Sequence, residues 1–313
     1  MTSPNVLFAG TPEFALASLE ALVEGVVVPA AVLTQPDRPA GRGKRLTASP
    51  VKRYAVEKDI PVLQPQSLRD PASAAEIAAL QPDILIVAAY GLILPQDVLD
   101  IPTHGCLNVH ASLLPRWRGA APIQAAILAA DAATGISLMS MTAGLDCGPV
   151  FVDEPISIGE HETAGELHDR LAKLGGRLLV ENLDNILAGN LPAKTQDESL
   201  ATYAGKITSA DAQLDWSLPS VDLVRRVRAY NPVPGAWCLL NDERIKCWRA
   251  HGGAQRADGD EIAGTVLSVA DDGLHVACAD GVIVMSELQR PGKGRVSAAQ
   301  FAAQTDPVGR RLT

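Results

Sequence analysis

The sequence of 313 residues has no run of about 18 uncharged apolar residues, the length that a membrane-spanning helix requires. Its N-terminus, MTSPNVLFAG, also lacks the basic segment and the long apolar segment of a signal peptide. Hydrophobic residues make up 47% of the chain and charged residues 20%, which argues against disorder. We therefore expect a folded cytoplasmic protein that acts without a membrane, and the length favours two domains.

Metal-binding and nucleotide-binding motifs are absent as well. The five cysteines are scattered and form no C-x-x-C pair, so we expect reduced thiols and neither disulfides nor a zinc cluster. His161 and His168 are too far apart in the sequence to share one metal-binding face of a helix. No G-x-G-x-x-G or G-x-x-x-x-G-K-[ST] motif is present for a nucleotide, and Ser112 lacks the G-x-S-x-G context of a hydrolase nucleophile.

Basic charge is scarce overall but unevenly distributed. The net charge of −9 disfavours a nucleic-acid partner, because phosphate binding needs Lys and Arg. Residues 205–313 contain 13 basic and 13 acidic residues, so the whole acidic excess lies in residues 1–204. Within that acidic part, residues 34–53 carry six basic side chains against Asp37 alone. Prolines and glycines in this segment predict an exposed loop, which is either ordinary solvated surface or a contact for an anion or nucleic acid.

Alternating strand-like and helix-like runs predict an α/β fold for the first part of the chain. The expected strands are residues 5–10, 26–34, 61–64, 83–90, 107–110 and 136–142. The expected helices are residues 14–23, with Thr11 as N-cap, 50–58, 71–80 and 121–130. This order is typical of a Rossmann-like, open, mostly parallel sheet with helices on both faces. Ligands bind beyond the carboxyl ends of such strands, so we expect the site near residues 10–11, 90–91, 108–110 and after Thr142.

A smaller second domain is predicted from the C-terminal part. Residues 163–187 have leucines at helical spacing and should close the first domain. After a helix at residues 221–230, short strand-like runs between residues 236 and 287 predict an OB-like β-barrel. The predicted boundaries are residues 1–189 for the first, catalytic domain, 190–207 for a polar linker and 208–313 for the barrel domain.

Side chains suited to catalysis are densest in residues 107–119, LNVHASLLPRWRG. Asn108 and His110 are two residues apart at an expected strand end, so both side chains point to the same face. The amide can donate a hydrogen bond to an oxyanion, and the imidazole can donate as imidazolium or relay a proton. Asp146, between glycines in GLDCGP, can hold that imidazole in its charged form. On spacing alone, a structural histidine and an ordinary turn aspartate remain open alternatives.

Longer motifs bear a resemblance to one family. They are TQPDRPAGRGKRL (34–46), SPVK (49–52), AAYGLILP (88–95), NVHASLLPRWRGAAPIQ (108–124), GLDCGPV (144–150), WS (216–217) and RAYNP (228–232). The NVHxSLLP core is similar to the formyltetrahydrofolate-dependent superfamily as a whole. The 34–46 segment and the C-terminal part narrow the resemblance to the methionyl-tRNA formyltransferase family, and the similarity spans nearly the whole chain.

The resemblance implies transfer of a formyl group from 10-formyltetrahydrofolate to the α-amine of methionyl initiator tRNA, without a metal. The residues that match the family's catalytic trio are Asn108, His110 and Asp146. Those that match its folate border are Ser112, Leu113, Leu114 and Pro115. Those implied to contact tRNA are Arg38, Arg42, Lys44 and Arg45. Ala111 and Cys147 depart from the Gly and Thr common in the family, and because both are small we expect no change of reaction.

Two other functions share part of this pattern. A formyltransferase for a small amine, such as a sugar nucleotide or glycinamide ribonucleotide, would share the NVHxSLLP core but not the 34–46 segment or the barrel. A non-catalytic RNA-binding protein would not need all three of Asn108, His110 and Asp146. The neutral barrel domain presents either a basic face or plain solvated surface through Lys206, Arg225, Arg226, Arg228, Lys293 and Arg295. The motifs carry no information on assembly, and a monomer is our expectation.

Overall fold

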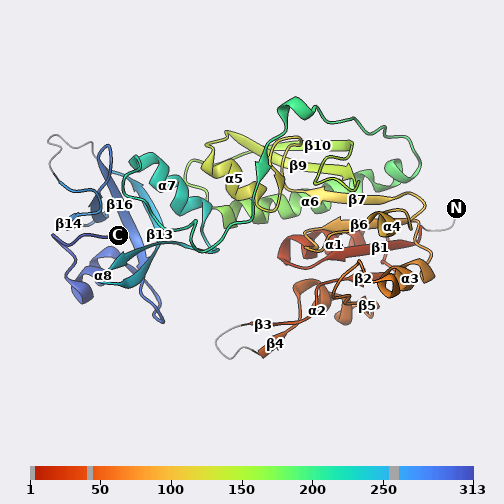
Figure 1. The fold of residues 1–313 in the computed structure, drawn as a ribbon, viewed down its shortest axis with the longest axis horizontal. Coiled ribbons are helices and arrows are strands. Elements are labelled where there is room, and N and C mark those ends of the chain that lie inside the picture. The colour runs from red at the N-terminus through yellow and green to blue at the C-terminus, as the bar shows by residue number, and fades with distance from the viewer. Residues whose placement is uncertain (1–3, 41–44, 254–260) are drawn as a thin grey trace. The chain divides into compact units, whose positions relative to one another are not determined.

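The computed structural model describes residues 4–40, 45–253 and 261–313, and the chain forms two compact units (Figure 1). The first unit contains Met1–Pro122, Ala133–Ser157 and His168–Ala204. The second contains Ile123–Ala132, Ile158–Leu167 and Gly205–Thr313. No helix in the described ranges is both long and apolar enough to cross a membrane.

A seven-stranded sheet forms the centre of the first unit. Its strand order is β10 (Val150–Ser157), β9 (Ala133–Ser140), β7 (Cys106–His110), β6 (Ile84–Ala88), β1 (Val6–Gly10), β2 (Ala31–Leu33) and β5 (Val62–Leu63). The strands from β7 to β5 are mutually parallel, and β1, β6 and β7 are buried at every position, as expected for continuous apolar runs covered on both faces. The predicted Rossmann-like, mostly parallel sheet is confirmed.

Helices cover both faces of this sheet. Ile77 of α3 (Pro71–Ala79) and Val98 of α4 (Gln96–Leu99) pack in one apolar cluster with alternate residues of β1 and β6. On the other face, α1 (Glu13–Gly25) packs against α2 (Pro50–Glu57). α1 also contacts α6 (Ala164–Leu187), where a Cβ on Gly176 would lie 2.9 Å from Ala21. The predicted helices are therefore present, although Thr11 is no N-cap, because its hydroxyl donates to the Tyr90 carbonyl instead (3.0 Å).

The loop that carries Asp146 does not start where the sequence predicts. β9 is antiparallel to β7, so that His110 pairs with Ser137 and Leu107 pairs with Ser140. The loop after β9 therefore begins beside the amino end of β7, and its expected start at the carboxyl end was wrong. It returns along the sheet to β10, and Gly148 permits the return because a Cβ there would strike the carbonyl oxygen of Ser140.

The basic segment contains a short hairpin. β3 (Arg38–Ala40) and β4 (Arg45–Thr47) pair only with each other and are antiparallel. Their register pairs Arg38 with Thr47, and the residues of β4 are exposed. The prediction of an exposed segment is confirmed, but the expectation of an irregular loop was wrong for these two strands, since an isolated pair of strands accommodates Pro39. Arg42 and Lys44 lie outside the described residues.

A polar segment after α6 packs against the first unit. It contains a 3₁₀ turn (Glu198–Leu200) and β11 (Tyr203–Ala204), which is parallel to β8 (Arg118–Gly119). Gly119 has a φ of 114°, and a Cβ there would lie 2.6 Å from the carbonyl oxygen of Ala204. The close pairing of these two strands therefore requires glycine at this position.

The second unit is built on an antiparallel sheet. Its order is β12 (Ala236–Leu240), β13 (Glu243–Gly252), β16 (Val282–Gln289), β15 (Gly273–Ala277) and β14 (Val266–Ala270), with β17 (Arg295–Ser297) also paired to β16. α7 (Ser220–Ala229) and α8 (Ala298–Thr305) contact this sheet, and α5 (Pro122–Leu128) lies mostly in the same unit. The predicted antiparallel strands and α7 are confirmed. α8 was not predicted, although Ser297 and Gln300 form a capping box at its start.

Gly135 of β9 pairs with Pro155 of β10, and Gly135→Ala tests the packing of the two strands. A Cβ there would strike the Glu154 carbonyl oxygen and lie 2.5 Å from Leu113 Cδ2. We expect a loss of about 1–3 kcal/mol in the free energy of unfolding, measured by urea denaturation. Gly205→Ala is the control, since nothing lies within 4 Å of its added Cβ. Equal stability of the two variants would contradict the packing argument.

Candidate active site

Three side chains expected to carry chemistry meet on one face of β7. Asn108 and His110 are 9% and 6% exposed, and both point to the same side of the strand. The Asp146 carboxylate lies between them, with Oδ1 3.5 Å from Asn108 Nδ2 and Oδ2 3.8 Å from His110 Nδ1. The amide of Asn108, the imidazole of His110 and the carboxylate of Asp146 thus share one wall of the site. The loop that carries Asp146 follows β9, which is antiparallel to β7.

A backbone N–H fixes the Asp146 carboxylate. Gly119 N donates to Asp146 Oδ2 at 2.8 Å, and the carboxylate is 16% exposed. Asp146 itself has a φ of 48°, a left-handed conformation that aspartate tolerates better than most side chains. Both the side chain and the backbone of Asp146 are therefore held in a specific geometry.

A backbone carbonyl fixes the His110 ring. Nε2 lies 3.2 Å from the Trp117 carbonyl oxygen, and because a carbonyl only accepts, Nε2 carries the hydrogen. Nδ1 is the nitrogen that faces Asp146. The separation of 3.8 Å is too long for a hydrogen bond but suits attraction between a carboxylate and an imidazolium.

The segment expected to border the folate forms a tight turn after β7. Ser112 is fully buried, and its hydroxyl donates to the Arg116 carbonyl at 2.6 Å. Ser137 Oγ bridges the turn, donating to the Ser112 carbonyl and accepting from Leu114 N. Leu114 and Pro115 line a cavity of about 350 Å³ together with residues 150–153 and 194–197. Leu113 packs near Gly135 of β9.

A buried arginine beside this site was not predicted from the sequence. Arg118 is 1% exposed, and its guanidinium donates to both carboxylate oxygens of Glu198 (2.8 and 2.9 Å). These hydrogen bonds raise the pKa of Arg118 and lower the pKa of Glu198. Arg118 also donates twice to Gln196 Oε1, at 2.8 and 3.1 Å. The only available signal was an arginine inside the dense 107–119 motif together with the polar run QDE at 196–198.

The base of the β3–β4 hairpin is tied to the sheet by a polar network. Lys52 Nζ donates to Asp37 at 2.8 and 3.0 Å and to Gln64 Oε1 at 2.7 Å. Gln64 in turn donates to Asp37 Oδ1 and to the Gln35 carbonyl. Lys52 is therefore engaged within the protein. Among the residues predicted to contact tRNA, Arg38 and Arg45 are the described ones, and both are exposed.

Most of the basic residues singled out in the second unit are engaged in it. Arg228 donates to the carbonyls of Glu162 and Gly159, Arg225 donates to Asp222, and Arg226 donates to the Asp211 carbonyl. Arg295 stacks over Trp248 at 3.9 Å. Lys206 and Lys293 are exposed. Fewer basic side chains of this unit are therefore available to bind phosphate than the sequence indicates.

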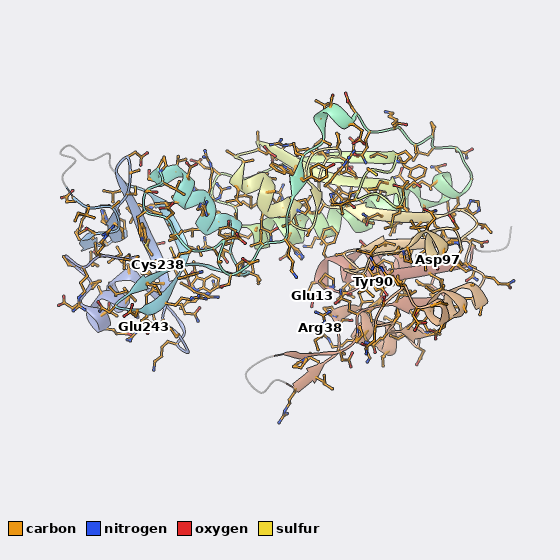
Figure 2. The ribbon with its side chains drawn as sticks, viewed as in Figure 1. Glu13, Arg38, Tyr90, Asp97, Cys238 and Glu243 are labelled. Carbon is orange, nitrogen blue, oxygen red and sulfur yellow. The ribbon has the colours of Figure 1, made fainter. Side chains whose placement is uncertain are left out.

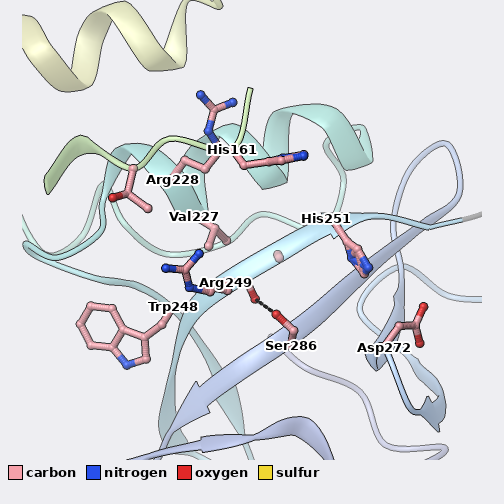
Figure 3. Close-up of a pocket in the computed structure, with 10 residues that line it drawn as sticks. His161, Val227, Arg228, Trp248, Arg249, His251, Asp272 and Ser286 are labelled. Atoms are coloured by element: carbon pink, nitrogen blue, oxygen red, sulfur yellow. Dashed lines mark hydrogen bonds between the residues drawn. The ribbon is translucent and has the colours of Figure 1, made fainter. Parts of the chain in front are cut away.

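A cavity of about 350 Å³ in the second unit collects histidine and arginine side chains (Figure 3). His161, Arg228, Arg249 and His251 line it, and Arg249 lies 3.8 Å from Glu166. None of Asn108, His110 and Asp146 lines it. Among the described residues, no group of three or more His, Cys, Asp or Glu side chains is arranged to hold a metal ion.

Sequence comparison identifies the family. A model of the formyl transferase family matches residues 5–183, and a model of the formyl transferase C-terminal domain matches residues 206–305. A methionyl-tRNA formyltransferase of Variovorax paradoxus is 54% identical, covering 96% of this chain and 96% of its own length. The chain belongs to the methionyl-tRNA formyltransferase family. A second relative, from Stutzerimonas stutzeri, is 52% identical over 93% of this chain and 92% of its own length. The family predicted from the motifs is confirmed.

Solved structures with low sequence identity share the fold. An N-formyltransferase from Helicobacter canadensis, in complex with folinic acid and dTDP-3-aminofucose, has a TM-score of 0.67 at 17% identity. That match covers 92% of this chain and 99% of the other. HypX from Aquifex aeolicus, in complex with tetrahydrofolic acid, has a TM-score of 0.64 at 17% identity, covering 97% of this chain and 48% of the other. At this identity the likeness concerns the fold alone.

The Asp37 network makes stability depend on pH. Hydrogen bonds from Lys52 and Gln64 lower the pKa of Asp37 in the folded state. Asp37 therefore stabilises the fold above its unfolded pKa of about 3.9, and this contribution is lost as the pH falls through the folded pKa. We expect Asp37→Asn to lower Tm at pH 7, and we expect the difference in Tm from the parent to shrink as the pH falls below about 3.9. A Tm difference that stays constant from pH 7 to pH 2 would contradict this assignment. Asp59→Asn, an exposed position, is the control.

Proposed function

We propose that this chain transfers the formyl group of 10-formyltetrahydrofolate to the α-amine of methionyl initiator tRNA, in the cytoplasm, for the initiation of translation. The observation that carries the proposal is the convergence of Asn108, His110 and Asp146 on one face of β7. It occurs in a chain more than half identical to relatives named for this reaction. Membership of the formyl transferase family supports formyl transfer as the reaction. The relatives named methionyl-tRNA formyltransferase favour the amine of an aminoacyl-tRNA over a small amine as the acceptor.

The nucleophile requires positioning more than activation. An α-amine has a pKa near about 8, so that an appreciable fraction is neutral at working pH. The folate supplies the formyl carbon that the amine attacks, and charge then develops on the formyl oxygen. Asn108 Nδ2 is suited to donate a hydrogen bond to that oxygen, as a neutral amide on a buried wall.

His110 and Asp146 manage charge and protons in this proposal. The Asp146 carboxylate stabilises an imidazolium on His110, whose Nδ1 faces it. The same carboxylate is suited to accept the proton that the amine loses as the new nitrogen–carbon bond forms. The folate nitrogen gains a proton as its bond to the formyl carbon breaks, so the overall transfer consumes no proton.

The residues near the turn fit an amphipathic co-substrate. The cavity beside Leu114 and Pro115 has apolar side chains from Val150 and Val152 and charged ones from Asp153 and Lys194. Together with the family match, this mixture supports Ser112, Leu113, Leu114 and Pro115 as the folate border. Ser112 would act by maintaining the shape of the turn, because its hydroxyl already donates to the Arg116 carbonyl.

The division of labour along the chain is also a proposal. We assign folate and the aminoacyl end to a catalytic domain at residues 1–189 and tRNA contacts to a barrel domain at residues 208–313. Residues 190–207 would connect the two, although the part up to Ala204 belongs to the first compact unit. Arg38 and Arg45 of the hairpin would add contacts at the acceptor end, as would Arg42 and Lys44, which lie outside the described residues. We expect the chain to act as a monomer.

The decisive experiment is incubation with 10-formyltetrahydrofolate and methionyl initiator tRNA, followed by mass analysis of the aminoacyl product. The proposal requires a mass increase of one formyl group on the methionine. A dTDP-amino sugar in place of the tRNA should remain unmodified. Formylation of the sugar alone would identify a small-amine enzyme, and tight tRNA binding without formyl transfer would identify a binding protein.

Replacing Asn108 tests the oxyanion contact. We expect Asn108→Ala to lower the single-turnover rate by about 10²–10³, as removal of one oxyanion donor does elsewhere. The rate should be measured by rapid quench with both substrates saturating. Asn190→Ala, at an exposed position, is the control. An unchanged rate in Asn108→Ala would remove Asn108 from the mechanism.

Replacing the exposed hairpin arginines tests the tRNA contact. We expect the double variant Arg38→Ala/Arg45→Ala to bind methionyl-tRNA more weakly and to flatten the slope of log K against log salt by about 0.7–0.9 per lost phosphate contact. Folate affinity should be unchanged, since the variant alters only the hairpin. Arg69→Ala, an exposed arginine outside the hairpin, controls for overall charge. Full tRNA affinity of the double variant at raised salt would refute this role for the two arginines.

A further inference from the structure

Residues 196–204 pair with residues 115–120, which follow the turn at Ser112. Thr202 N donates to the Pro115 carbonyl (3.2 Å), and Thr202 Oγ1 accepts from Trp117 N (2.9 Å). Arg118 N then donates to the Thr202 carbonyl (2.9 Å). Ala120 N donates to the Ala204 carbonyl (2.8 Å). Backbone groups of residues 115, 117, 118 and 120 are thus hydrogen-bonded to this segment.

The same segment, residues 115–120, supplies the two backbone groups that orient the candidate acid–base pair. The Trp117 carbonyl accepts from His110 Nε2, and the Gly119 N–H donates to Asp146 Oδ2. Trp117 has a φ of 61°, an uncommon conformation for an aromatic residue that surrounding contacts must maintain. The positions of both side chains therefore depend on the 196–204 segment.

Gln196 also holds the Asp146 loop directly. Its Nε2 donates to the carbonyls of Asp146 (2.9 Å) and Gly148 (2.7 Å), and its Oε1 accepts twice from Arg118. The side chain is 8% exposed, and these contacts use both of its N–H groups and both oxygen lone pairs. A fully bonded buried amide fixes its partners more firmly than an exposed one, because no water can replace a lost bond.

We propose that Gln196 is a positioning residue for the transfer reaction, anchored by Arg118 and holding Asp146 against Asn108 and His110. This inference rests on the proposed function. Gln196 also lines the cavity proposed for folate, but its amide is bonded to the Asp146 and Gly148 carbonyls and to Arg118, so that it acts through the Asp146 backbone. A misplacement of about 1 Å can lower a rate by about 10²-fold, so loosening this loop should act on turnover more than on binding.

Two variants separate the contacts of Gln196. Gln196→Met removes every hydrogen bond while keeping similar length, and Gln196→Glu keeps an acceptor for Arg118 but loses the two donors at neutral pH. We expect both to lower kcat by about 10–100-fold, with KM for each substrate within about twofold of the parent value. Should Gln196→Met fail to fold, Gln196→Glu carries the experiment.

A matched control removes the same kind of contact elsewhere. Asn5 Nδ2 also donates to two backbone carbonyls, those of Leu80 and Gln81 (2.6 and 3.0 Å), at the amino end of β1. Asn5→Leu should lower Tm with kcat within about twofold of the parent value. A comparable fall of kcat in Asn5→Leu would show that general loosening explains the effect, and it would overturn the proposal.

A double-mutant cycle with Asp146→Asn gives the sharpest outcome. If Gln196 acts through Asp146, the kcat of the double variant should be within about twofold of that of Asp146→Asn alone. Multiplicative losses, or a parent-like kcat in both Gln196 variants, would overturn the inference while leaving the proposed function intact. A parent chain that fails to formylate, or an Asp146→Asn variant with full activity, would instead refute the proposed function and its site.

Discussion

The candidate site depends on how one carboxylate is held. Asp146 is mostly buried, so its charge interacts strongly with whatever lies near it, and a small change in its direction changes which group it stabilises. The protein fixes it with a backbone donor from Gly119. Through this bond the carboxylate faces His110 and Asn108 without forming a tight ion pair. The carboxylate therefore lies close to both side chains, and its Oδ2 is directed by the backbone rather than by either of them.

Figure 2 shows the side chains of the described residues on the ribbon. Holding one side chain in this way requires chain segments that are far apart in sequence. β7 supplies Asn108 and His110, the loop between β9 and β10 supplies Asp146, and residues 117–119 supply the backbone groups between them. The turn at Ser112 is itself bonded to Ser137 of β9. Each segment is bonded to another by groups that are buried or part-buried, and the polar segment 196–204 adds the bonds from Gln196 to the Asp146 loop.

The sequence predicts the parts of this arrangement that have a local signature. Period-two alternation puts Asn108 and His110 on one face, and apolar runs identify β1, β6 and β7. Strand direction has no such signature, because an apolar run reads the same in a parallel and an antiparallel strand, and so the course of the loop after β9 was missed. Arg118 and Gln196 meet across 78 residues, and neither has a periodic neighbour that would indicate a buried partner.

Counting basic residues in a sequence overstates the charge available to a polyanion, and the structure shows why. In the basic segment, Lys52 is bonded to Asp37, and Arg53 donates to the Ala48 carbonyl and lies 3.6 Å from Glu13. In the second unit, Arg228 is bonded to two carbonyls. Basic side chains that are already bonded within the protein contribute little to phosphate binding. The net charge of −9 matters equally little, since at physiological salt charges beyond about 8 Å are screened. A phosphate approaching the hairpin would therefore respond chiefly to exposed side chains such as Arg38 and Arg45, and recognition of tRNA is determined locally.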